Sequence, residues 1–214
     1  MYILAHRGMW ENAQERNSID AIEKAMVNGF GFETDFRDYC GKLVISHDIA
    51  SDNVSLAEDV FSLMSKYKDH YTIAINIKSD GLSLLLAELL NRYNIRNYFV
   101  FDMSIPQMVE FNEGGFRFFT RQSEIENPPV MYKESSGLWL DGFFGTDWID
   151  EELIRKYQAD GKSICIVSPE LHHRDDYLDF WKKLNSFDVD FSDIMLCTDY
   201  PDKAKGFFNE RNKC

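Results

Sequence analysis

Two acidic side chains stand inside an otherwise apolar segment near the N-terminus. Glu33 and Asp35 lie two residues apart within residues 30–36. Because alternate residues of a strand point to the same face, both carboxylates lie on one side of it. Burying an unpaired carboxylate is costly, so each requires a cation or a hydrogen-bond donor. Carboxylate oxygens suit a hard divalent cation such as Mg²⁺ or Ca²⁺.

A second polar pair repeats this spacing further along the chain. Asn76 and Lys78 end the apolar segment 72–77, and the amide oxygen of Asn76 adds a third oxygen ligand for the cation. Lys78 and Arg7 add positive charge for an anion, and the Arg guanidinium matches two phosphate oxygens at once. We therefore expect a metal site of Glu33, Asp35 and Asn76 beside a phosphate.

Two histidines complete the predicted site. His6 and His47 both follow apolar segments, and imidazole titrates near neutral pH, so one can activate an attacking hydroxyl while the other protonates a leaving alcohol. Each residue also has an ordinary structural role open to it. A strand-end histidine can simply hydrogen-bond, Glu-x-Asp can form a surface ion pair, and Lys78 can be solvated. Their joint placement favours catalysis.

The elements that position these residues alternate between strand and helix. Residues with helical spacing, such as Ile19, Ile22 and Met26, separate most of the apolar runs. Alternation of this kind predicts a parallel sheet, and eight units predict a single α/β domain over residues 1–214, a compact (β/α)8 TIM-like barrel with its site at the C-terminal ends of the strands. The eight predicted strands are 2–5, 30–36, 72–77, 98–101, 117–120, 138–141, 163–167 and 194–197.

Three local features refine this prediction. Residues 43–47 predict a small hairpin inserted after the second strand, and 121–137, with two consecutive prolines, predict a loop in place of a helix. Asn17 is the expected N-cap of the first helix, and the segment from Pro201 is expected to form the last one.

Composition limits the function classes. The 214 residues carry a net charge of −13, which argues against binding to nucleic acid, where Lys and Arg dominate affinity. No segment is apolar and long enough for stable membrane insertion, and the start of the chain lacks a leader-like pattern. No Cys-x-x-Cys pair occurs, so buried thiols in the cytoplasm are expected. The cysteines are Cys40, Cys165, Cys197 and Cys214.

The chain resembles the glycerophosphodiester phosphodiesterases, TIM-barrel enzymes related to phosphatidylinositol-specific phospholipase C. This resemblance implies a small insertion after strand two, a divalent metal ion, and hydrolysis of a phosphodiester to an alcohol and a phosphomonoester. The motifs that carry it are His6-Arg7-Gly8, Asn17-Ser18, Glu33-x-Asp35, His47-Asp48, Ile77-Lys78 and Thr198-Asp199-x-Pro201.

Carried onto this chain, the resemblance makes His6 and His47 the acid–base pair and Arg7 and Lys78 phosphate contacts. Glu33 and Asp35 become metal ligands. Asn76 stands where the family usually has Glu, so the site loses one negative charge and its metal affinity should fall. Arg16 likewise stands where the family usually has Glu.

The seventh strand also departs from the family, because it leads into Ser168-Pro169-Glu170-Leu171-His172. Glu170 and His172 are predicted to contact the alcohol part of the substrate, or Glu170 to reach the metal. Alternatively, this segment only begins a helix, with proline in its first turn. Trp10 is a further predicted substrate contact.

The leading interpretation is a hydrolase for a small glycerophosphodiester or a related polyol or sugar phosphodiester. One alternative is a phospholipase-like enzyme acting on a lipid or on a surface polymer. The other is a barrel that binds phosphodiesters without cleaving them, which the loss of charge at Asn76 supports.

Overall fold

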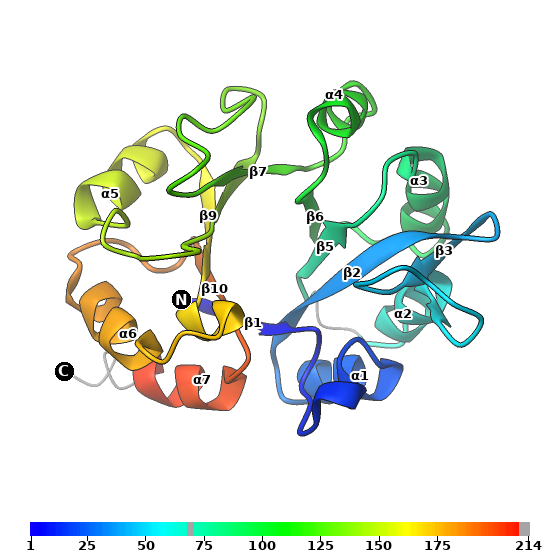
Figure 1. Ribbon diagram of the computed structural model, residues 1–214, viewed down its shortest axis with the longest axis horizontal. Helices are drawn as coiled ribbons and strands as arrows, with labels where there is room; N and C mark the ends of the chain where they lie inside the picture. Colours follow the sequence, from blue (N-terminus) through cyan, green and yellow to red (C-terminus); the bar gives the residue numbers. More distant parts are fainter. Residues whose placement is uncertain (68–70, 210–214) are drawn as a thin grey trace. The chain divides into compact units, whose positions relative to one another are not determined.

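The computed structural model describes residues 1–67 and 71–209, and the chain divides into two compact units. We call residues His6–Phe118 the N-terminal unit, and Met1–Ala5 together with Phe119–Cys214 the C-terminal unit. Helices and strands alternate along both (Figure 1). All residues of the predicted metal site fall in the N-terminal unit.

The sheet of the N-terminal unit has three parallel strands and a two-stranded antiparallel extension. The parallel strands β2, β5 and β6 are level at their C-terminal ends, because Asp35 pairs with Asn76 and Asn76 pairs with Phe101. The sheet order is β4-β3-β2-β5-β6. The strands are β2 (Gly31–Tyr39), β3 (Lys42–Ile45), β4 (Ser55–Leu56), β5 (Ile73–Ile77) and β6 (Tyr98–Phe101).

Helices cover this sheet with apolar faces. In α1 the buried residues Ala21, Ile22, Ala25 and Met26 follow the helical spacing of the sequence. α1 contacts β2 and α2, and α2 contacts β3 and α3. The helices are η1 (Ala13–Glu15), α1 (Ile19–Val27), α2 (Ala57–Met64), α3 (Ser83–Arg92) and α4 (Ile105–Glu113).

The sheet of the C-terminal unit is parallel throughout. Its order is β1-β10-β9-β8-β7. The strands are β1 (Tyr2–His6), β7 (Phe119–Gln122), β8 (Gly137–Leu140), β9 (Ser163–Val167) and β10 (Ile194–Thr198), and the helices are α5 (Glu151–Ala159), η2 (Pro169–His172), α6 (Tyr177–Ser186) and α7 (Pro201–Asn209). His6, the last residue of β1, is the first residue of the N-terminal unit.

Most predicted elements are confirmed. The hairpin forms between β2 and β3, because Cys40 and Gly41 both adopt positive φ, as a tight two-residue turn requires. Residues 123–136 form neither helix nor strand, and η2 begins at Pro169 as a short 3₁₀ helix. The strand predicted at 117–120 lies at 119–122, since Phe118 bridges to Val100 instead.

The predicted N-cap is wrong by one residue. Ser18 caps α1, with its hydroxyl oxygen accepting a hydrogen bond from the backbone N–H of Ala21. Asn17 adopts a left-handed conformation and turns its amide toward β2. The side chain of Asn17 hydrogen-bonds to Asp35 in β2 and is therefore not used to cap the helix.

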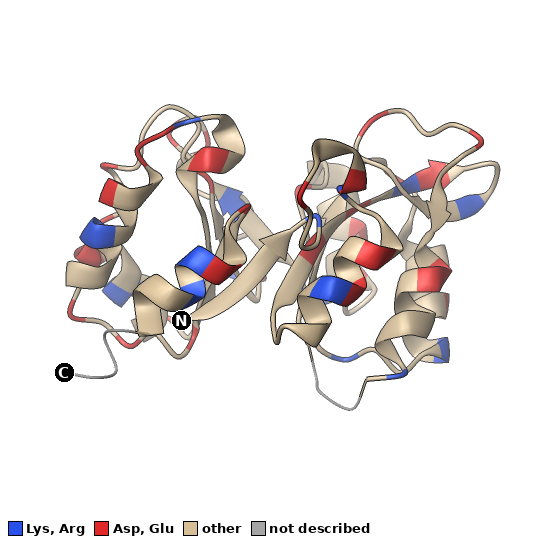
Figure 2. Cartoon of the chain, turned by 90° about the horizontal axis from the view of Figure 1, so that it is seen from below, with Lys and Arg blue, Asp and Glu red and all other residues tan. Residues whose placement is uncertain are grey.

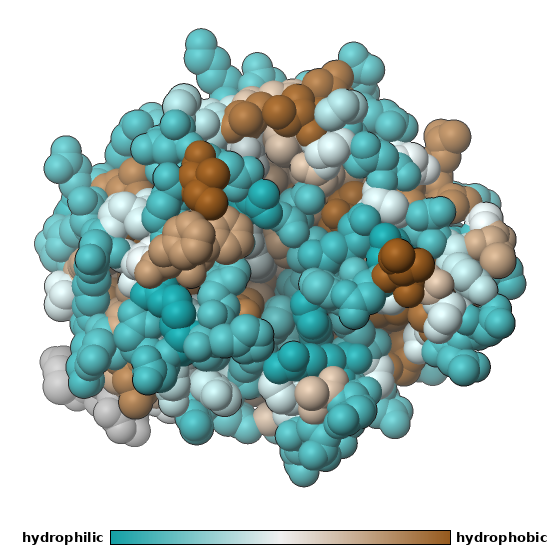
Figure 3. Space-filling model, viewed as in Figure 1, coloured by the Kyte–Doolittle hydropathy of each residue, from teal (hydrophilic) through white to brown (hydrophobic). Residues whose placement is uncertain are grey.

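Acidic residues are spread over helices and loops of both units (Figure 2). The face seen in Figure 3 is mainly hydrophilic with scattered hydrophobic patches. None of the helices in the described ranges has the length and apolarity to cross a bilayer. Cys165 and Cys197 are buried and Cys40 is exposed, and these three form no disulfide among the described residues. Cys214 lies outside the described residues.

We predict that Gly8 is required for the loop between β1 and α1. It has φ +83°, and an added Cβ would lie 2.7 Å from the backbone carbon of Ala21. Gly41→Ala is the matched control, since φ is +71° with no atom within 4 Å. We expect Gly41→Ala to lower the free energy of unfolding by about 1 kcal/mol, and Gly8→Ala by roughly 1–3 kcal/mol more from the clash. Equal losses in urea unfolding would contradict this.

Candidate functional site

Arg7 connects the two buried carboxylates of β2. Its backbone N–H donates to Glu33 Oε2 over 3.2 Å, and its Nε lies 3.0 Å from Asp35 Oδ2. Glu33 and Asp35 are 1 % and 0 % exposed. Arg7 has φ 57°, a conformation that costs energy and recurs at functional sites. One residue therefore supplies a donor and a positive charge to both carboxylates.

Lys78 approaches the other oxygen of Asp35. Its Nζ is 3.4 Å from Asp35 Oδ1 and 3.3 Å from Asp102 Oδ2, at the end of the neighbouring strand β6. The backbone N–H of Lys78 donates to the backbone carbonyl of Phe36. This hydrogen bond extends the ladder between β2 and β5 by one residue. The structure thus brings together Arg7, Asp35 and Lys78, and adds Asp102, which sequence reasoning did not identify.

The side chain of Asn17 hydrogen-bonds to Asp35 and fixes its position. Its Nδ2 donates to Asp35 Oδ2 over 2.8 Å, and its Oδ1 accepts from the hydroxyl of Thr34 at 2.8 Å. The backbone N–H of Asn17 donates to the carbonyl of Arg7, so the loop closes on the site. The sequence signal was present in the Asn17-Ser18 motif, but the prediction assigned Asn17 to helix capping.

Two buried oxygens at this site accept no hydrogen bond within the described part of the chain. They are Asp35 Oδ1 and Asn76 Oδ1, which belong to residues paired in register on adjacent strands. Leaving a buried acceptor unsatisfied costs about 1–3 kcal/mol, so such atoms call for a partner. A hard cation is a suitable one, and Glu33 on the same strand face completes an oxygen donor set.

This donor set fits a cation only if the amide takes part. Over residues 1–67 and 71–209, no group of three or more His, Cys, Asp or Glu side chains is arranged to hold a metal. A cation here would therefore need Asn76 as a third ligand beside Glu33 and Asp35. The ammonium of Lys78 lies against Asp35, and a metal would have to share that carboxylate with it.

The electrostatics of Glu33 point to missing positive charge. Burial and the neighbouring charge of Asp35 raise the pKa of Glu33 to about 7, although the charges of His6, Arg7 and Lys78 act in the opposite direction. His6 Nε2 is 3.9 Å from Glu33 Oε2, and its side chain is 13 % exposed. The ring of His6 is therefore at the edge of the carboxylate cluster.

His47 lies in the loop after β3 and is more accessible than His6. Its side chain is 45 % exposed, and its Nδ1 is 2.9 Å from Asp48 Oδ1. The hydrogen bond with His47 lowers the pKa of Asp48, and the charges of His47 and Arg7 act in the same direction. Asp48 thus orients the imidazole and leaves Nε2 as the ring nitrogen available for a ligand.

Trp10 is held against the loop that carries His6. Its indole N–H donates to the carbonyl of His6 at 3.0 Å, and the guanidinium of Arg16 lies 4.1 Å from its ring centroid. Arg16, where the resemblance led to an expectation of Glu, therefore stacks on Trp10. This contact fixes Trp10, and its predicted role as a substrate contact stays a prediction.

Glu170 and His172 belong to the C-terminal unit, where both have protein partners. Glu170 is buried and accepts hydrogen bonds from the hydroxyls of Ser168 and Thr198 and from the backbone N–H of Asp199. Burial raises its pKa, and the two hydroxyls oppose that shift. Glu170 thereby links the ends of β9 and β10.

His172 Nε2 is hydrogen-bonded to Asp141 at the end of β8, and its ring lies 4.8 Å from that of Phe143. The roles of Glu170 and His172 as substrate contacts stay predictions.

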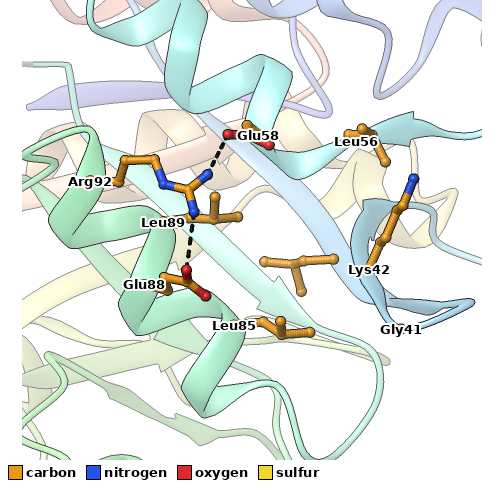
Figure 4. Close-up of a pocket in the computed structure, with 9 residues that line it drawn as sticks. Gly41, Lys42, Leu56, Glu58, Leu85, Glu88, Leu89 and Arg92 are labelled. Carbon is orange, nitrogen blue, oxygen red and sulfur yellow. Dashed lines mark hydrogen bonds and ion pairs between the residues drawn. The ribbon is translucent and has the colours of Figure 1, made fainter.

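The cavity in Figure 4 is separate from this group of residues. It has a volume of about 250 Å³ and is lined by residues of β3, α2 and α3, including Leu85 and Leu89. On its rim Arg92 forms ion pairs with Glu58 and Glu88. No predicted site residue lines this cavity, so the residues around Glu33 and Asp35 at the strand ends are the better candidate site.

Comparison with solved structures identifies the fold. A glycerophosphodiester phosphodiesterase from Parabacteroides distasonis matches with a TM-score of 0.78 at 15 % identity, covering 99 % of this chain and 98 % of the other. One from Agrobacterium tumefaciens matches with a TM-score of 0.70 at 16 % identity over 100 % of both chains. The chain has the fold of the glycerophosphodiester phosphodiesterases. The resemblance indicated by the motifs is thus confirmed at the level of fold, an α/β fold of the TIM-barrel type.

A third solved structure carries a ligand. A phosphodiesterase from Oleispira antarctica, in complex with the product sn-glycerol-3-phosphate, matches with a TM-score of 0.69 at 14 % identity, covering 98 % of this chain and 97 % of the other. No model of a known protein family matches the sequence, and no curated protein matches it. The likeness therefore lies in the structure and in the motifs rather than in overall sequence identity.

We predict that the metal-free protein loses stability as the pH rises from about 4.5 to about 7. In this window folded Glu33 stays protonated, with its pKa at about 7, while the unfolded chain titrates near 4.5. The folded state binds more protons, so the free energy of unfolding falls with pH, by roughly 3 kcal/mol for this group. Urea unfolding in a chelator measures it. An equally steep pH dependence in Glu33→Gln would contradict the assignment.

Proposed function

We propose that this chain is a metal-dependent phosphodiester hydrolase. It acts on a glycerophosphodiester or a related polyol or sugar phosphodiester, and releases an alcohol and a phosphomonoester. The observation that carries the proposal is the buried pair Glu33 and Asp35 in β2, with Arg7 and Lys78 beside it. Two oxygens of this site, on Asp35 and Asn76, accept no hydrogen bond from the described residues. The likeness to glycerophosphodiester phosphodiesterases supports the same reaction class.

Arg7 and Lys78 bind the phosphate in this mechanism. Both side chains are largely buried, at 18 % and 17 % exposed, so their charges act with little screening by water. The guanidinium offers paired donors to two phosphoryl oxygens, and the ammonium offers a compact charge. Since charge builds up on these oxygens as the diester is attacked, fixed donors stabilise the transition state more than the substrate.

His6 and His47 move protons. One imidazole accepts the proton of the attacking hydroxyl, and the other donates a proton to the departing alcohol oxygen. Asp48 fixes His47 through Nδ1, so its Nε2 exchanges the proton with substrate. Attack by water and attack by a neighbouring substrate hydroxyl, through a cyclic phosphate, use the same residues. Trapping a cyclic product distinguishes the two routes.

Glu33, Asp35 and Asn76 would hold the divalent cation, Mg²⁺ or Ca²⁺. When bound, the cation supplies positive charge to the phosphoryl oxygens. In this ligand set the two carboxylates would supply negative charge, and the amide of Asn76 would supply a neutral oxygen. This arrangement also answers how a chain with net charge −13 attracts an anionic diester.

A second candidate function is a barrel that binds phosphodiesters without cleaving them. The observation that favours it is Asn76, which leaves the metal site one carboxylate short. His6 and His47 distinguish the two candidates, because binding alone does not require two proton-transfer groups.

We predict that removing either imidazole slows turnover strongly but leaves the fold intact. His6→Asn and His47→Asn should each lower kcat on a chromogenic phosphodiester by about 10²–10⁴-fold, the usual contribution of a general acid or base. His173→Asn is the matched control, since His173 is exposed and has φ 59°, which Asn tolerates. Undiminished turnover in both variants would overturn the acid–base roles of His6 and His47, whereas no turnover by the wild type on a broad panel of phosphodiesters would favour the binding function.

We predict that turnover requires a divalent cation and that restoring the third carboxylate tightens its binding. Chelation should abolish activity, and Mg²⁺, Ca²⁺ or Mn²⁺ should restore it. Asn76→Glu should lower the Kd for Mn²⁺ by about tenfold, which corresponds to about 1.4 kcal/mol. Calorimetry measures this, with Asn76→Gln as the control that changes length without charge. Equal affinity of the two variants would remove Asn76 from the ligand set.

A further inference from the structure

Lys78 is shared between two carboxylates at the ends of β2 and β6. Its Nζ lies 3.4 Å from Asp35 Oδ1 and 3.3 Å from Asp102 Oδ2. The side chain of Asp102 is 19 % exposed, whereas that of Asp35 is fully buried. The ammonium therefore stands between a buried carboxylate of the proposed metal site and a partly exposed carboxylate outside it.

This sharing matters for Asp35 Oδ1. The Oδ2 atom of Asp35 already accepts from Asn17 and pairs with Arg7. Oδ1 accepts no hydrogen bond within the described residues. Asp35 pairs in register with Asn76, whose own Oδ1 also accepts none there. Oδ1 is thus the atom of Asp35 that a metal would take, and Lys78 is its competitor.

Asp102 lies where it can compete with Asp35 for the ammonium of Lys78. Phe101 pairs with Asn76 across β5 and β6, and Asp102 is the next residue. It has φ +69°, a left-handed conformation that costs energy and that Asp and Asn tolerate better than other side chains. The turn directs its carboxylate to the ammonium at the level of the metal site.

We propose that Asp102 is a positioning residue: it accepts the hydrogen bond of Lys78, leaves Asp35 Oδ1 only an ion pair with that ammonium, and so keeps this oxygen available to a divalent cation. Asp102, at the end of the neighbouring strand β6, also supplies an acidic group close to the neutral Asn76. Glu33, Asp35 and Asp102 bring three carboxyl groups to two basic side chains, Arg7 and Lys78, and an excess of acidic oxygen ligands favours a dication. The inference rests on the proposed function, because it assumes a metal at Glu33, Asp35 and Asn76.

The test measures Mn²⁺ binding by calorimetry in four proteins: wild type, Asp102→Asn, Lys78→Met and the double variant. Asn keeps the left-handed turn available. Without Asp102 the ammonium settles on Asp35, so Asp102→Asn should raise the Kd about tenfold, within the usual range for coupled neighbours. Lys78→Met removes the competitor and should lower the Kd. In the Lys78→Met background, Asp102→Asn should change the Kd less than about twofold.

The control is Glu58→Gln, which removes one carboxylate and an ion pair with Arg92 but none of the strand-end residues. It should leave the Kd unchanged. An equal loss of affinity in Glu58→Gln would reduce the effect to general charge and overturn the proposal.

A tenfold loss that persists in the double variant would make Asp102 a direct ligand and also overturn the positioning role. An unchanged Kd in Asp102→Asn, with Mn²⁺ bound by the wild type, overturns this inference and leaves the proposed function standing. A wild type that binds no Mn²⁺ overturns both. If Asp102→Asn does not fold, Lys78→Met decides alone: a lower Kd supports the competition, and an unchanged or higher Kd refutes it.

Discussion

The burial of two carboxylates two residues apart in β2 is the constraint on which the N-terminal unit depends. Glu33 and Asp35 are almost fully removed from water, and ionised carboxylates are stable there only with positive charge and donors around them. Arg7, Lys78 and Asn17 supply these from a loop, a neighbouring strand and the segment before α1. Three residues around these carboxylates, Arg7, Asn17 and Asp102, have left-handed backbone conformations.

The positive charges and hydrogen-bond donors around Glu33 and Asp35 do not fully offset the burial of the two carboxyl groups. The pKa of Glu33 rises to about 7 because burial and Asp35 outweigh His6, Arg7 and Lys78. Asp35 Oδ1 and Asn76 Oδ1 accept no hydrogen bond within the described part of the chain. Both facts indicate the same deficit, a missing positive charge on the oxygen-lined side of β2 and β5. A divalent cation would meet that deficit, and the proposed function places an anionic phosphodiester beside Arg7 and Lys78.

The fold explains why a site of this kind can be assembled from short motifs. Parallel strands level at their C-terminal ends bring side chains from remote positions to one edge of a sheet, as the registers of β2, β5 and β6 show. The three solved structures described above share this fold at 14–16 % identity. Most of the sequence can therefore differ while the fold is retained.

The sequence by itself determined what depends on local periodicity. Apolar runs separated by helical spacing located the strands and most helices, the turn at Cys40 and Gly41 located the hairpin, and the period of two placed Glu33 with Asp35 and Asn76 with Lys78. Only the tertiary structure decided that Ser18 caps α1 in place of Asn17, that Arg16 stacks on Trp10, and that Asp102 shares Lys78 with Asp35. The physical reason is that these contacts join residues whose pairing depends on strand register and loop conformation. A short polar residue such as Asn or Asp can satisfy either a local cap or a distant partner, and the choice depends on which buried charge lies within reach.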